Sequence, residues 1–174
     1  MKKKLLNPRI ILLAISTIVI FSACKKNEDN SPTANLIGTW NTSSSSFSAT
    51  IGDKTMTQYF IDVMGATASD AQLSTNLFNL MLQQAFTGTI TFKADDTYTS
   101  TLGNQPDNGT WAISADGTKL TIDPSSGNAI LLNIEQLTKS TLQVHTQESF
   151  SDDVNQDGTP ETITADIDLT FTKQ

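Results

Sequence analysis

The residues best suited to binding a metal ion lie close together near the end of the chain, in the segment SDDVNQDGTPET. Asp153, Asn155 and Asp157 occupy alternating positions, Gly158 follows them, and Glu161 comes shortly after. Calcium takes hard oxygen ligands, and an EF-hand loop places them at alternating positions with a glycine at the sixth. The spacing therefore predicts a weak structural calcium site formed by these four oxygen-bearing side chains.

The same segment also has the composition of a turn between two strands. Asp, Asn and Gly favour tight turns because they adopt the backbone angles that turns require. The twelfth position of the loop is Thr164, which cannot supply the bidentate carboxylate of an EF-hand. Thr164 also belongs to a strand pattern, so an EF-hand is excluded. Two alternatives remain, a plain hairpin loop and a hairpin loop that binds calcium weakly with help from Asp152 or Glu161.

Other chemistry has few candidate residues. His145 is the only histidine and Cys24 is the only cysteine. Catalytic triads and structural zinc sites need more of these residues than the chain contains. On its strand His145 shares parity with Thr141 and Gln143, so it is expected to face solvent. The sequence therefore predicts a protein that is not an enzyme and that has no cofactor apart from the weak calcium.

The N-terminus has the pattern of a secretory signal. Three lysines at positions 2–4 and Arg9 precede an apolar run over residues 10–21, which is shorter than the about 20 residues of a membrane-spanning helix. The following FSAC resembles the lipobox of bacterial lipoproteins, whose cysteine is acylated and becomes the first residue of the mature chain. The resemblance implies a signal peptide over 1–23 and a lipid on Cys24. The alternative is an uncleaved membrane anchor.

The residues after Cys24 bear on where the protein is held. Lys25 stands where an aspartate would resemble an inner-membrane retention signal, so the outer membrane is expected, on its periplasmic or cell-surface side. An anchor with more than one acyl chain binds a membrane stably. Residues 24–35 are polar and lack periodicity, which predicts a tether, and residues 36–174 are expected to form one folded domain.

The charge of the chain excludes one class of partner. Its formal net charge is −7, and its only arginine is Arg9 in the predicted signal. Proteins that bind nucleic acid neutralise phosphates with clustered Lys and Arg, which the predicted domain lacks. We therefore expect no nucleic-acid partner, whereas the protein partner, if there is one, stays unknown.

Most of the predicted domain alternates between apolar and polar residues, which is the pattern of half-buried strands. The segments GTITFKA, TYTSTL, TWAIS, KLTID, residues 129–137, residues 141–150 and ETITADIDLTFTK follow one another with short turns. Their inward residues are predicted to be Ile90, Phe92, Ile113, Leu120, Ile122, Leu132, Leu142, Val144 and Ile167. One segment has helical spacing instead, with Leu73, Leu77, Leu80 and Met81 on one stripe and Phe78 beside it. Ser69 and Gln72 form a capping-box pattern before it, and Gly88 is expected to end it.

This order predicts an all-β, mainly antiparallel fold. One or two strands come first, one amphipathic helix follows, and about seven more strands complete an up-and-down β-barrel of about 8–9 strands. Closure into a barrel removes the exposed strand edges that an open sheet would leave. A two-sheet β-sandwich is the alternative.

The start of the predicted domain, LIGTW, resembles the Gly-x-Trp signature of lipocalins at Gly38 and Trp40. The segments TFKADDTYTS and TWAISADGTKLTI stand where lipocalin-like bacterial lipoproteins have their hairpins. The resemblance implies an eight-stranded barrel that can hold a small apolar ligand, with Trp40 at one end. In lipocalins a late arginine covers this tryptophan, and Lys173 is the only late cation here.

Two functions are consistent with these observations. The first is a membrane-anchored envelope lipoprotein that binds a small apolar or amphipathic molecule inside its barrel. The second is a structural or interaction lipoprotein with a filled barrel that acts through its surface in an envelope assembly. A barrel of eight strands can be filled by its own side chains, so an inner volume of about 300 Å³ or more would favour the first.

Overall fold

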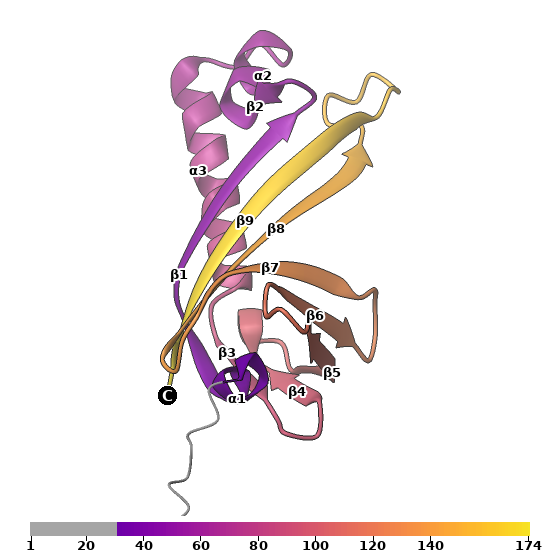
Figure 1. Ribbon diagram of the computed structural model, residues 1–174. Coiled ribbons are helices and arrows are strands. Elements are labelled where there is room, and N and C mark those ends of the chain that lie inside the picture. The colour runs from indigo at the N-terminus through magenta and orange to yellow at the C-terminus, as the bar shows by residue number, and fades with distance from the viewer. Residues whose placement is uncertain (1–30) are drawn as a thin grey trace, which may run out of the picture.

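The alternating segments form a meander of antiparallel strands, as the ribbon in Figure 1 shows. The computed structural model describes residues 31–174. In chain order the elements are α1 (Pro32–Leu36), β1 (Gly38–Ile51), β2 (Lys54–Thr55), α2 (Met56–Asp62), α3 (Ala68–Ala85), β3 (Thr89–Phe92), β4 (Thr97–Ser100), the 3₁₀ turn η1 (Leu102–Asn104), β5 (Asp107–Ile113), β6 (Lys119–Pro124), β7 (Ile130–Leu137), β8 (Thr141–Asp152) and β9 (Glu161–Lys173).

The sheet closes on itself through its first and last long strands. Neighbours in the sheet follow chain order from β3 to β9, and β9 also pairs with β1. This closing pairing runs from Trp40 opposite Lys173 to Ile51 opposite Ile163. Eight strands therefore form a barrel, and the two-residue β2 is added as a ninth at the end of β1. The predicted up-and-down barrel is confirmed, and the sandwich alternative is wrong because β1 and β9 close the sheet.

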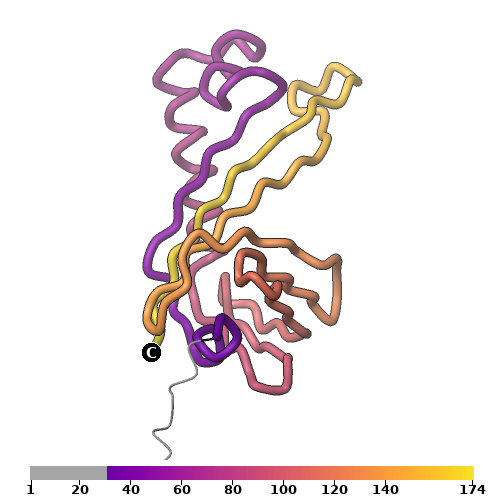
Figure 2. The backbone as a smooth tube through the Cα atoms, viewed as in Figure 1, coloured from indigo at the N-terminus to yellow at the C-terminus, as the bar shows by residue number. Residues whose placement is uncertain are grey.

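Three of the strands are much longer than the others. β3 pairs with β1 only between Gly38 and Asn41, and the pairing of β7 with β8 extends no further along β8 than His145. Beyond these points β1, β9 and β8 continue together as a three-stranded ribbon, which rises above the short strands in Figures 1 and 2. We call residues 47–51, 146–152 and 161–167 the sheet extension. The molecule thus consists of a closed barrel and an open extension of its seam.

Two helices lie against the sheet extension (Figure 1). α2, which was not predicted, begins at the N-cap Thr55, whose hydroxyl accepts a hydrogen bond from the Gln58 amide. Its Met56 and Tyr59 are buried together with Ile51 and Ile163 of the sheet. This apolar cluster is separate from the barrel interior and stabilises the part of β1 and β9 that the barrel does not enclose.

Helix α3 begins at a different residue from the one predicted, and a different face of it packs against the rest of the fold. Its N-cap is Thr67, whose hydroxyl accepts from the Asp70 amide, so the predicted cap at Ser69 is wrong. The helix turns Ala71 and Phe78 inward. The predicted apolar stripe lies in solvent instead, and its members are Leu73, Leu77, Leu80 and Met81, the last 69% exposed. Within residues 31–174 no element covers this stripe.

The described chain starts earlier than the predicted domain. Helix α1 begins inside the segment predicted as a tether, residues 24–35, and ends at Leu36, the first residue of the predicted domain, which is completely buried. Ser31 caps the helix by accepting a hydrogen bond from the Ala34 amide, and Pro32 suits the first turn because it needs no donor there. Cys24 and the predicted signal peptide lie outside the described residues. None of the helices in residues 31–174 is both long and apolar enough to cross a membrane.

Candidate functional site

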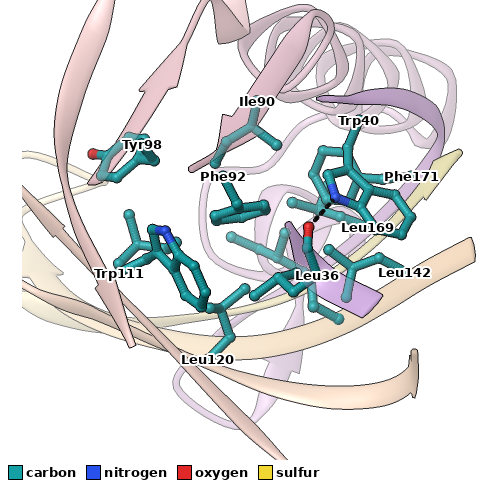
Figure 3. Packing of buried hydrophobic residues seen from close by; sticks show 13 residues of the cluster. Leu36, Trp40, Ile90, Phe92, Tyr98, Trp111, Leu120, Leu142, Leu169 and Phe171 are labelled. Carbon is teal, nitrogen blue, oxygen red and sulfur yellow. Dashed lines mark hydrogen bonds between the residues drawn. The ribbon is translucent and has the colours of Figure 1, made fainter. Parts of the chain in front are cut away.

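One end of the barrel is closed by Trp40 and helix α1. The Trp40 ring is completely buried, and its indole N–H donates a 2.7 Å hydrogen bond to the Leu36 carbonyl, drawn as a dashed line in Figure 3. Phe171 and Leu142 lie beside the ring in the same view. The predicted position of Trp40 at one end of the barrel agrees with this arrangement. Ligand access through this end is therefore blocked by protein atoms.

Lys173 covers the outer side of this closed end. Its ammonium lies 5.0 Å from the centroid of the Trp40 ring and donates a 2.7 Å hydrogen bond to the Asn35 carbonyl. Partial burial lowers the pKa of Lys173. Gly38 leaves room for its chain, because a Cβ at this position would lie 2.5 Å from the Lys173 Cε. The lysine therefore occupies the place that the resemblance assigns to an arginine.

Above this closed end the barrel contains a cavity of about 430 Å³. Its walls are mainly apolar, and they include Ile90, Phe92, Leu120, Ile122, Leu142, Val144, Ile167, Leu169 and Phe171. The interior is thus filled near Trp40 and hollow further along the axis. The volume exceeds the roughly 300 Å³ at the lower end of ligand pockets in proteins.

The polar lining of the cavity gathers at the opposite end from Trp40. Its polar members are Tyr98, Ser100, Asp107, Asn128, Thr146 and Glu148. Ser100 ends β4, Asp107 begins β5 and Asn128 precedes β7, all at the strand ends far from Trp40, whereas Tyr98 lies within β4 and Thr146 and Glu148 lie within β8. The Tyr98 hydroxyl donates a 2.5 Å hydrogen bond to Asp107 Oδ2. Burial, together with this hydrogen bond, raises the pKa of Tyr98, so its hydroxyl stays protonated. We call this end the mouth.

Helix α3 reaches the mouth through the residue that follows it. Phe86 lines the cavity, and its ring stacks on Phe47 of the sheet extension with centroids 5.6 Å apart. The Phe86 carbonyl accepts a 2.6 Å hydrogen bond from the Thr42 hydroxyl, which ties the helix end to β1. The end of the helix therefore forms one wall of the mouth.

The model of the lipocalin-like domain matches residues 36–144. The chain belongs to this family. Lipocalin-like domains are typically binding folds rather than catalytic ones. The match begins at Leu36 and includes the Gly38–Trp40 signature and the strands that form most of the cavity wall.

A DUF4847 family protein from Bacteroides vulgatus is similar over 80% of this chain and 95% of that chain, with 14% sequence identity and a TM-score of 0.37. The comparison with curated proteins found no match.

In this lipocalin-like domain the predicted calcium residues form the connection between β8 and β9. Asp153 accepts backbone hydrogen bonds from Asp157 and Gly158, and Asn155 accepts one from Asp157. Asp157 Oδ1 accepts from the Thr159 amide, and this bond lowers the pKa of Asp157. These oxygens stabilise the turn itself, as in the plain hairpin alternative. Among the described residues, no group of three or more His, Cys, Asp or Glu side chains is arranged to hold a metal ion.

Glu161, the fourth predicted calcium residue, points to a different part of the lipocalin-like domain. One of its carboxylate oxygens accepts from the Val154 amide, and the other accepts a short hydrogen bond from the Tyr59 hydroxyl. Burial and the neighbouring carboxylate raise the pKa of Tyr59 to about 12. Glu161 therefore connects the loop to α2, a contact that sequence reasoning missed because α2 was not predicted.

His145 lies on the outer face of β8, as predicted, and it has a partner. Its Nδ1 is 2.9 Å from the Asp168 carboxylate on β9, and its Nε2 is 3.9 Å from Asp166. Thr146, the next residue, points inward and lines the cavity. The histidine is therefore separated from the cavity by the sheet.

Proposed function

We propose that the protein is a membrane-anchored envelope lipoprotein whose barrel binds a small apolar or amphipathic molecule without changing it chemically. The observation that carries the proposal is the cavity of about 430 Å³, which is closed by Trp40 at one end and has polar residues at the other. An apolar body is stabilised by transfer from water to such walls. A polar head group would remain at the mouth beside Asp107 and Glu148.

A surface role in an envelope assembly is the second candidate. The exposed stripe of Leu73, Leu77, Leu80 and Met81 on α3 favours it, because exposed apolar patches often mark interaction sites. The hollow interior does not fit the filled barrel that this alternative assumed. We therefore place ligand binding first.

Native mass spectrometry of the full chain, purified from the envelope of its own cells, tests the ligand proposal. We expect a co-purifying small molecule, and we expect Val144→Phe to lose it because Val144 lines the cavity. Gln147→Phe, on the exposed outer face of the same strand, is the matched control and should retain the molecule. Far-UV circular dichroism checks that both variants keep the sheet. A wild-type chain that carries no molecule and takes up no neutral apolar dye would contradict the proposal.

The anchor is tested separately. We propose that Cys24, which lies outside the described residues, carries the lipid and holds the protein at the outer membrane. Labelling of cells with a radioactive fatty acid should mark the wild-type chain and leave Cys24→Ser unmarked. The variant should also leave the outer-membrane fraction. Equal labelling of both chains would contradict lipidation at this residue.

A further inference from the structure

The mouth of the cavity carries negative charge. Among the residues that line the cavity, Asp107 and Glu148 are the charged ones, and both are carboxylates. Asp107 begins β5, and Glu148 lies on β8 beyond its pairing with β7. Both side chains share the inward parity of buried neighbours on their strands, Trp111 and Val144 respectively. They therefore lie where the head group of an amphipathic ligand would be.

The lysines of the described chain lie elsewhere. Lys93, Lys119, Lys139 and Lys173 all lie at strand ends or turns of the closed end. Lys54, at the far end of the sheet extension, forms a 2.9 Å ion pair with Asp62. Since Arg9 is the only arginine in the sequence, the described residues place no side-chain cation in the cavity wall. A carboxylate head group would thus meet like charge and find no counter-ion.

The two carboxylates differ in their existing contacts. Within residues 31–174 the Glu148 carboxylate makes no hydrogen bond or ion pair. Asp107 receives the Tyr98 hydroxyl on Oδ2, and its Oδ1 has no partner among the described residues. Because the Glu148 carboxylate and the Asp107 Oδ1 have no partner within residues 31–174, both side chains can accept hydrogen bonds from a donor head group. A cationic head group would also be attracted by these two charges, and such attraction raises the rate of association.

We propose that the cavity selects amphiphiles with a cationic head, such as long-chain amines, over fatty-acid anions. This inference rests on the proposed ligand-binding function and names its ligand class. The alkyl chain lies against the apolar wall, and the ammonium lies at the mouth beside Glu148 and Asp107.

A matched set of ligands separates the head group from the chain. The full chain, held in a non-ionic amphipol, is titrated by calorimetry with decylamine, decanol and decanoate. Uptake of ligand by the amphipol is common to the wild type and the variants, so the difference between them reports binding to the protein. We expect decylamine to bind about tenfold more tightly than decanoate, because two carboxylates lie at the mouth. Glu148→Gln should weaken decylamine binding about threefold and leave decanol unchanged. Asp166→Asn, on the outer face of β9, is the control and should change neither.

Salt and a cavity-filling variant complete the test. Decylamine affinity should fall as sodium chloride is raised, whereas decanol affinity should not, since salt screens charge. Decanoate binding as tight as decylamine, or decylamine binding indifferent to Glu148→Gln and to salt, would overturn the head-group inference and leave ligand binding intact. Binding of all three ligands that Val144→Phe does not reduce would instead overturn the proposed function.

Discussion

The ammonium of Lys173, on the last strand, lies 5.0 Å from the centre of the Trp40 ring, on the first. The same ammonium donates to the Asn35 carbonyl of α1. One side chain therefore joins the two ends of the described fold where the barrel closes. We expect Lys173→Met, which keeps the chain and removes the charge, to lower the free energy of unfolding by about 1 kcal/mol. Urea denaturation measures the change, and Lys119→Met, an exposed lysine at the same end, should have almost no effect.

Replacement of Gly38 by alanine should lower the free energy of unfolding by more than the strain of its backbone angle alone. Gly38 has a φ of +138°, and an added Cβ would lie 2.5 Å from the Lys173 Cε. Gly127 has a comparable φ of +120° with no atom within 4 Å of such a Cβ, so it separates backbone strain from the clash. We expect Gly127→Ala to lower the free energy of unfolding by about 1 kcal/mol and Gly38→Ala to lower it by about 2 kcal/mol or more. Equal costs in thermal or urea unfolding would show that the lysine moves aside freely.

The two sides of α3 should respond differently to substitution. Phe78 packs against the apolar cluster under α2, whereas its neighbour Leu77 is 53% exposed. Phe78→Ala should lower the free energy of unfolding by about 2 kcal/mol, because it leaves a cavity between helix and sheet. Leu77→Gln should change it by less than about 0.5 kcal/mol. A large loss for Leu77→Gln would mean that the stripe is covered in the protein in solution.

The turn between β5 and β6 should contribute stability that depends on acid. Asp116 accepts hydrogen bonds from Ser114 and Thr118, which lower its pKa from 3.8 to about 2. Because its pKa is lower in the folded state, the carboxylate stabilises the fold above about pH 4 and loses this effect as the pH falls toward 2. Chemical denaturation between pH 5 and 2 should therefore show a shallower decline for Asp116→Asn than for the wild type. Parallel curves would contradict the assignment.

The loop between β8 and β9 should lose order when Asp153 is replaced. Its two carboxylate oxygens accept the amides of Asp157 and Gly158, so Asp153→Ala leaves both donors without that acceptor. We expect faster amide hydrogen exchange at these two residues and a lower melting temperature.

The calcium site predicted from the sequence is tested by melting temperature as well: millimolar calcium should raise the melting temperature of a chelator-treated wild type, and Asp157→Ala should abolish the rise. The absence of a rise would leave the hairpin alternative alone.

Much of the barrel could be predicted from the sequence, because strands with one face in solvent alternate strictly between apolar and polar residues. The same period placed Ile90, Phe92, Leu120, Ile122, Leu142, Val144 and Ile167 inside, and all seven are buried. Ile113 and Leu132 are also inward but only half-buried. The closed end was predictable too, because Gly38 and Trp40 stand in a short motif and Lys173 is the only late cation.

The mouth and the helices were less predictable. Helix α3 has apolar residues on two sides, and periodicity alone does not say which side packs against the sheet, so the pattern does not identify Phe78 as the buried residue. The pattern does not identify Glu148 as a lining residue either, because its position on the cavity wall depends on where the pairing of β7 with β8 stops. Helix α2 is only seven residues long and gives little periodic signal. These features are set by tertiary contacts that a local pattern does not contain.

The closing seam also determines the order in which the barrel can fold. The Ser43 hydroxyl bonds the Thr170 carbonyl across 127 positions, and the whole of β9 lies between β1 and β8. The hairpins from β3 to β8 are local and can form early, but contacts of such long range form late because closing a long loop costs entropy. A chain still being synthesised has no β9 until residues 161–173 have been made, so β1 has an unpaired edge until then. The barrel and its cavity therefore cannot be complete before β9 is present.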